Sequence, residues 1–176
     1  MKTETILIDK LGNGFGDAMT AADNLAAANH LGKHEMMKLE LITEEMLGLV
    51  RIVTAADNMS FWIECEDGLY QFHLSTKTKM TLEKRTNLLY TSSSMKNSAA
   101  SGLLGKLRDK FEQAMLLNSE DTNPAMSEMS HDIYCNNYES AEWDKYERSV
   151  LRNTADEIRI GIRGGKIEMI VSKRFA

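Results

Sequence analysis

A surplus of positive charge is the first thing that this 176-residue chain lacks. Its 26 acidic residues outnumber its 21 lysines and arginines, which gives a net charge of -5 at pH 7. No excess of basic residues remains to neutralise phosphates, and the lysines and arginines are scattered rather than gathered in one stretch. We therefore exclude nucleic acid as an expected partner.

Long apolar runs are also missing. No stretch is long enough to span a bilayer as a helix, and the opening residues MKTETILIDK lack the apolar core of a signal peptide. We therefore expect a cytoplasmic protein that has no membrane partner. The hydrophobic content of 43% and the charged content of 27% are ordinary for a globular protein. This length suits one domain with a substantial core, and we expect a single domain over residues 1–176.

Cysteine and proline are both scarce. Cys65 and Cys135 are the only cysteines, and they lie far apart with no CxxC pattern. We interpret them as reduced thiols, with one disulfide as a less favoured alternative and a metal site as the least favoured. The only proline, Pro124, lies in the polar and acidic stretch 118–139. We expect that stretch to be an irregular insertion in the domain, and we predict no metal-binding residues.

The hydrophobic pattern divides the remaining sequence into strands and helices. In chain order we expect a strand at 3–9, a helix that Asp17 caps and Gly32 ends, a helix over 35–55, a hairpin over 61–75, a mobile loop over 91–102, a helix over 103–117, a helix over 140–155 and a hairpin over 157–175. This order predicts an α/β two-layer sandwich of the α+β kind. Helices should pack on one face of a mixed, mostly antiparallel sheet.

The closing hairpin is the most completely specified element. Gly164-Gly165 is a favoured two-residue turn between two strands. The register that follows pairs apolar residues on one face: Ile162 with Ile167, Ile160 with Met169, and Ile158 with Val171. Cross-strand pairs of this kind fix the register of a hairpin.

Two adjacent glutamates interrupt the apolar pattern of the helix over 35–55. At about 100° per residue the helix has one broad apolar face, made of Leu39, Ile42, Met46, Leu49, Val50 and Val53. Glu44 falls on the opposite, solvated side. Glu45 falls on the border of the apolar face, where partial loss of water would raise its pKa toward that of a general base. The alternative is a glutamate that reaches water or pairs with Lys38.

The same helix resembles a known family. Its stretch KLELITEEMLGLVR, residues 38–51, resembles the second helix of the histidine-kinase-like ATPases, the GHKL or Bergerat superfamily. Within that superfamily it is most similar to the anti-sigma-factor type of serine kinase domain. The stretches 61–75, 101–111 and 157–175 resemble, in turn, the two strands that follow, the glycine-containing phosphate loop and the last two strands. The resemblance covers most of the chain except 118–155.

The resemblance implies a histidine-kinase-like ATPase fold and a cytoplasmic regulator that binds ATP with Mg²⁺ and acts through a protein partner. Glu45 would take the place of the family's general base. Gly102, Gly105 and Lys106 would cradle the phosphates, since amides at a helix N-terminus bind phosphate. The alternative for these two glycines is a structural turn. An active site of this kind would carry an ATP-dependent serine/threonine protein kinase activity.

The sequence departs from the family at the other nucleotide motifs. The family's asparagine, one turn after the glutamates, holds magnesium, but here Gly48 and Leu49 stand there and supply no oxygen ligand. The family's aspartate-x-glycine motif, which recognises adenine, is replaced by HLSTKTKMTLEKR over 73–85. Phosphoryl transfer depends on a positioned metal and positioned charge, so we expect catalysis to be poor or absent.

Three functions remain open from the sequence. The first is an anti-sigma-factor-like regulator with weak ATP binding. The second is a non-catalytic protein-interaction module that has lost nucleotide binding, and it would use the old nucleotide groove or a sheet face; a homodimer is compatible with either. The third is an unrelated α/β enzyme. Trp62 is expected on the sheet face opposite the core, near Tyr70 or His73, as part of a partner surface or under the insertion.

Overall fold

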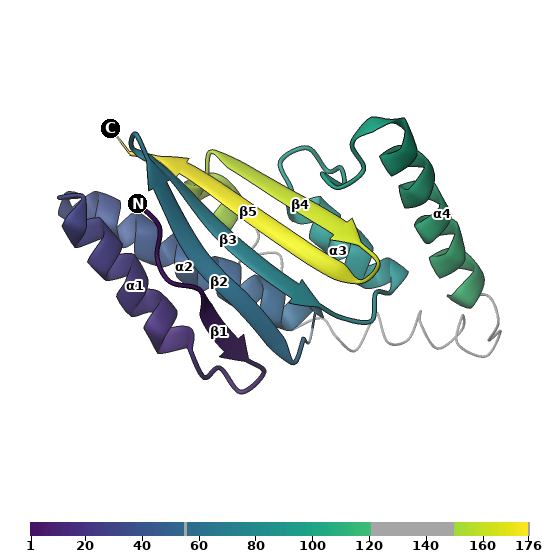
Figure 1. Cartoon of the computed structure of the whole chain (residues 1–176), viewed down its shortest axis with the longest axis horizontal. Coiled ribbons are helices and arrows are strands. Elements are labelled where there is room, and N and C mark those ends of the chain that lie inside the picture. Colours follow the sequence, from purple (N-terminus) through teal and green to yellow (C-terminus); the bar gives the residue numbers. More distant parts are fainter. Residues whose placement is uncertain (55, 121–149, 176) are drawn as a thin grey trace.

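The computed structural model describes residues 1–54, 56–120 and 150–175 (Figure 1). The named elements are β1 (Ile6–Asp9), α1 (Phe15–Ala28), α2 (Lys33–Thr54), β2 (Asn58–Glu66), β3 (Leu69–Lys77), α3 (Leu82–Thr91), α4 (Gly102–Glu120), β4 (Glu157–Arg163) and β5 (Lys166–Arg174). No helix in these ranges has both the length and the apolar character needed to cross a membrane.

A five-stranded sheet with the order β1-β2-β3-β5-β4 forms one layer of the fold. In Figure 1 the helices α1, α2 and α3 lie behind this sheet, and α4 stands beyond β4. The expected two-layer α+β architecture is therefore confirmed. The sheet is antiparallel rather than mixed, because every pairing between the named strands of the described chain is antiparallel. The hairpins β2–β3 and β4–β5 join through β3 and β5, and β1 pairs with β2, so these strands have no parallel neighbours.

Both expected hairpins are present with the expected turns. Asp67 and Gly68 join β2 to β3, and both have positive φ values, 49° and 73°. Gly164 and Gly165 join β4 to β5 with φ values of 56° and 77°. Positive φ at both central residues is the geometry that matches the twist of the flanking strands. The observed register of the second hairpin contains all three predicted pairs: Ile158 with Val171, Ile160 with Met169, and Ile162 with Ile167.

The core lies between the sheet and the helices behind it. Along β2 and β3 buried residues alternate with half-buried ones, so the described helices cover one face of the sheet more completely than the other. From α2 the core receives five of the six residues predicted for its apolar face: Leu39, Ile42, Met46, Leu49 and Val50, all fully buried. The side chain of the sixth, Val53, lies outside the described part of the structure. The helix over 35–55 is thereby confirmed, and its long apolar face determines which side of the sheet is packed.

The connection from β1 to α1 differs from the prediction. The strand starts at Ile6, and α1 begins after Gly14 as N-cap, so Asp17 lies in the first turn instead of capping the helix. Gly14 has a φ of 89°, and a Cβ there would lie 2.2 Å from the carbonyl oxygen of Leu7. Only glycine tolerates both conditions, and so the chain turns at Gly14.

Gly32 starts α2 instead of ending α1. The first helix already ends at Ala28, with Asn29 as its C-cap. The amide of Gly32 donates to the carboxylate of Glu35 at 2.8 Å. Its carbonyl accepts from the amide of Met36 at 2.9 Å. Glu35 therefore satisfies a backbone donor at the start of α2, as a glutamate in the first turn commonly does.

The segment after β3 contains a helix that the sequence prediction missed. The hydroxyl of Thr81 accepts from the amide of Lys84 at 3.1 Å and caps α3. The following stretch, predicted as a mobile loop, is instead hydrogen-bonded along β4. The amide of Ser93 donates to the carbonyl of Ile158, and the amide of Ser98 donates to that of Ile160, both at 2.9 Å.

The predicted insertion and the helix before β4 are only partly described. Residues 118–120 belong to α4, so the irregular stretch cannot begin at 118. Residues 121–139 lie outside the described part of the chain. Of the helix predicted over 140–155, residues 150–154 are helical, and Leu151 is buried in the core.

Candidate functional site

The two glutamates of α2 lie where the helical pattern places them. Glu44 is exposed, as predicted for a surface residue. Glu45 is half-buried beside the fully buried Met46, at the border of the apolar face. The next turn supplies the half-buried Gly48 and the buried Leu49, whose side chains hold no oxygen atom. The helix therefore presents one carboxylate at the border and no metal ligand from that turn.

The three residues predicted to cradle phosphate lie at the start of α4. Gly102 is exposed, with a φ of 73° and open space around its Cα. Gly105 is buried, and a Cβ there would come within 3.1 Å of the backbone carbon of Ala100. Lys106 is exposed. The packing of Gly105 against the preceding loop gives it a structural role, which was the alternative weighed for this motif.

Glu45 and this glycine motif lie on different helices, α2 and α4. α4 contacts α3, and α3 contacts α2. In Figure 1, α4 stands apart from α2 with α3 between them. A nucleotide site needs its base and its phosphate cradle around one ligand. These four predicted residues are instead distributed over separate helices.

A polar network, not foreseen from the sequence, holds α4 against the sheet. Arg85 of α3 is only 4% exposed, and its Nη2 lies 2.6 Å from Oδ1 of Asp109. The side-chain amide of Asn97 donates to the same Oδ1 and, at 2.8 Å, to the carbonyl of Ile162. Its Oδ1 accepts from the amide of Ile162 at 2.8 Å. One asparagine thus satisfies both backbone groups of a residue on β4, the edge strand.

The side of α4 that faces the domain is polar from Asp109 to Glu112, and the half-buried Leu116 follows on the same side. Glu112 accepts from the amide of Gly164 at 3.3 Å and pairs with Arg108 at 3.7 Å. Together with Asp109 and the buried Gly105, these residues occupy the side of the helix turned toward the rest of the domain. α4 is therefore attached by hydrogen bonds and ion pairs more than by apolar packing.

The apolar side of α4 points away from the domain. We define the outer face of α4 as the five residues Leu103, Leu104, Leu107, Phe111 and Met115, which are 78%, 82%, 58%, 66% and 57% exposed. At about 100° per residue they occupy one side of the helix, across from Gly105 and Asp109. A helix over 103–117 was predicted, and α4 covers that range. The orientation of its apolar side was not predicted, because periodicity does not tell which neighbour a face contacts.

The open face of the sheet carries an aromatic cluster. The rings of Trp62 and His73 stack at 4.8 Å with an interplanar angle of 5°. The indole NH donates to Glu64 at 3.0 Å, and Lys2 pairs with Glu64 at 2.9 Å and lies over the indole ring. The predicted orientation of Trp62 and its proximity to His73 are confirmed, whereas Tyr70 is buried on the core side.

Burial and hydrogen bonding each shift one pKa in this cluster. Burial lowers the pKa of His73, and the neighbouring Glu64 carboxylate partly opposes the shift. Hydrogen bonds from Lys2 and Trp62 hold the pKa of Glu64 below its usual value. His73 Nε2 is 3.7 Å from Glu64 Oε2 and makes no hydrogen bond. The two shifts favour a neutral imidazole beside a charged carboxylate.

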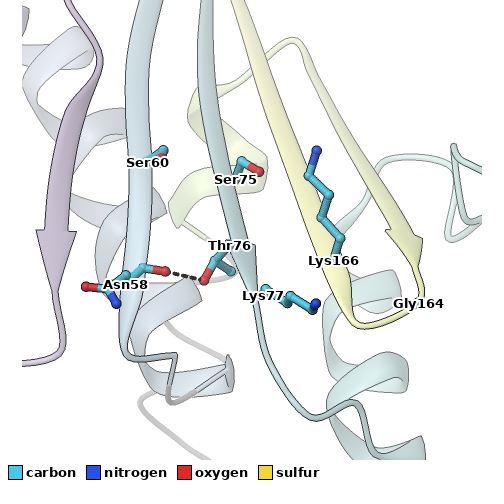
Figure 2. Close-up of a pocket in the computed structure, with 7 residues that line it drawn as sticks. All are labelled: Asn58, Ser60, Ser75, Thr76, Lys77, Gly164 and Lys166. Atoms are coloured by element: carbon cyan, nitrogen blue, oxygen red, sulfur yellow. Dashed lines mark hydrogen bonds between the residues drawn. The ribbon is translucent and has the colours of Figure 1, made fainter.

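A shallow polar cavity of about 390 Å³ lies near one end of the sheet (Figure 2). Its lining residues are Asn58, Ser60, Ser75, Thr76, Lys77, Gly164 and Lys166. Thr76 donates to the carbonyl of Asn58 at 2.6 Å, and Lys166 is held by Glu168 at 2.6 Å. The lining includes none of the residues predicted for the nucleotide site. It also holds no carboxylate that would act as a base.

In the described ranges no three His, Cys, Asp or Glu residues are grouped as metal ligands. Comparison with models of known protein families gives no match, and comparison with curated proteins gives none either. Function must therefore be argued from the side chains of this chain and their arrangement.

Proposed function

We propose that this chain is a non-catalytic protein-interaction module that regulates another polypeptide by binding it through the outer face of α4. The observation that carries the proposal is the inverted orientation of that helix. A surface helix normally buries its apolar side and exposes its polar side. Here Asp109 and Glu112 face the domain while Leu104 and Phe111 face outward. A contiguous exposed apolar patch on a folded domain commonly marks an interaction site.

The histidine-kinase-like ATPase fold is part of this proposal. Its support is the element order, in which a strand, two helices and a hairpin precede the last helices and the closing hairpin. The position of Glu45 on the second helix supports it as well. On this proposal the chain is an anti-sigma-factor-like regulator of the cytoplasm that has kept the framework of the ATPase without its chemistry.

The arrangement of α2 and α4 favours a module over an enzyme. Phosphoryl transfer requires a base, a metal and phosphate donors held around one nucleotide. Gly48 and Leu49 offer the metal no ligand, and the glycine motif begins a helix beyond α3. Loss of nucleotide binding explains these features together.

The first test is the thermal stability of the purified chain with and without millimolar Mg-ATP. A ligand at one hundred times its dissociation constant stabilises a protein by ~2.7 kcal/mol, so real binding raises the melting temperature visibly. On addition of Mg-ATP we expect no rise for the wild type and none for Glu45→Ala. A rise that disappears in Glu45→Ala would overturn the non-catalytic assignment.

The second test is photo-cross-linking in the cells that naturally produce the chain. The full chain carries a photo-reactive amino acid in place of Leu107. The matched control is Met37 on α2, which is 56% exposed, compared with 58% for Leu107. We expect irradiation to join another polypeptide to the Leu107 position and none to the Met37 position. Equal yields at both positions, or no adduct at Leu107, would refute an interaction role for α4.

A further inference from the structure

We infer that the polypeptide bound by the outer face of α4 is a second copy of this chain, in a symmetric dimer of two α4 helices. This inference rests on the proposed function, since it names the partner of the surface on which that function depends. A single apolar stripe on one helix is self-complementary, and a two-fold axis uses the same patch on both subunits.

The area of the outer face suits a dimer of this kind. With the exposed fractions given above, its five side chains present on the order of 600 Å² of apolar surface, the upper end of the largest patch on typical monomers. A standard interface buries about 800 Å² on each partner. Lys106, Lys110 and Leu117 are exposed beside the outer face and add to the area that a dimer would bury, since lysine stems cover apolar surface while their ammonium groups stay in water.

The order of residues along α4 defines how two copies fit. In an antiparallel pair centred near residue 109, Leu104 of one copy lies opposite Met115 of the other. Leu107 then lies opposite Phe111, so the two largest central side chains pack against each other. The partner helices also run with opposed dipoles, which places each basic N-terminal half near the negative end of the other helix.

The rigid attachment of α4 makes it suitable as a dimer surface. The Arg85–Asp109 pair and the hydrogen bonds of Asn97 fix the helix before any partner arrives. A surface held in its bound orientation loses less conformational entropy on association. The polar inner side therefore holds the helix, and the outer face is left available for a second copy.

The test is the mass of the purified full chain by analytical ultracentrifugation, from low micromolar to several hundred micromolar protein. A monomer has a mass of 19.8 kDa, and we expect twice that mass at the higher concentrations. Leu107→Glu and Phe111→Glu place a charge at the centre of the pair on exposed positions, so the fold should remain intact by circular dichroism. Each should weaken self-association by at least ~100-fold, since central interface residues dominate affinity.

Met37→Glu is the matched control and should dimerise like the wild type. A wild-type chain that stays monomeric at every concentration would overturn the dimer. The cell experiment then separates the two proposals. An adduct between Leu107 and a different polypeptide would refute the dimer but not the interaction module. A chain that is monomeric and forms no adduct at Leu107 would refute both proposals, because its outer face would then be covered by its own chain.

Discussion

Removing the carboxylate of Asp109 should destabilise the domain, because its partner Arg85 would remain as a buried cation. The ion pair is 2.6 Å long, and the two side chains are 5% and 20% exposed. Breaking a buried pair by removing one partner typically costs ~3–5 kcal/mol. Because Asp109 keeps some contact with water, we expect the lower end of this range, about 3 kcal/mol, for Asp109→Ala.

Equilibrium unfolding in urea, followed by circular dichroism, measures this loss. Domains of this size are stable by about 5–15 kcal/mol in total, so a loss of 3 kcal/mol moves the midpoint strongly. Lys106→Ala is the control on the same helix. Its side chain is exposed, and surface substitutions of this kind change the free energy of unfolding by less than about 0.5 kcal/mol.

A paired substitution tests the cause of the loss. Asp109→Leu combined with Arg85→Met removes both charges and fills the space with apolar atoms, a change that is often neutral for buried pairs. We expect the double variant to be more stable than Asp109→Ala. If the free energy of unfolding of Asp109→Ala lies within about 0.5 kcal/mol of the wild-type value, the Arg85 side chain is hydrated in the variant. The buried network then does not hold α4.

Two further predictions concern the sheet face and the first turn. Because burial lowers the pKa of His73 below its unfolded value of about 6.5, the unfolded chain binds the proton first as the pH falls. The free energy of unfolding should therefore decrease below that pH. Urea unfolding at a series of pH values should show a smaller decrease for His73→Gln than for the wild type or for His34→Gln. Equal decreases would contradict the burial of the imidazole. Gly14→Ala should cost more than ~1 kcal/mol, since its Cβ would lie 2.2 Å from the Leu7 oxygen at a positive φ. Gly16→Ala, where nothing lies within 4 Å, is its control in thermal unfolding, and equal melting temperatures would contradict the steric reasoning.

The hairpins were predictable because local chemistry alone determines them. Gly164-Gly165 requires a turn, and the alternation on each side then allows one register that keeps Ile160 and Met169 on one face. The apolar side of α2 was predictable for a similar reason, since its periodicity extends over several turns. In both cases the information lies within one short stretch of sequence.

The attachment of α4 was not predictable in the same way. Arg85 looks like a surface residue in the sequence, and its burial depends on Asp109 and Asn97, which lie 24 and 12 residues further along the chain. The apolar stripe with Leu107 and Phe111 resembles that of any core-facing helix. A signal was nevertheless present, because Thr81 caps a helix in which Arg85 and Leu88 share one side. A charged residue on the buried side of a helix indicates a partner elsewhere.

The two sides of α4 have separate tasks, and this separation has a physical consequence. The ion pair of Asp109 with Arg85 contributes specificity of position, since two charges and an asparagine satisfy one another in a single arrangement. Apolar packing contributes affinity without a required direction. On the proposed function, a helix placed by polar bonds keeps its apolar residues, such as Leu104 and Phe111, for a partner. A nucleotide-binding helix would need its apolar side in the core, whereas the apolar side of α4 is exposed. The orientation of α4 thus favours association over catalysis in this chain.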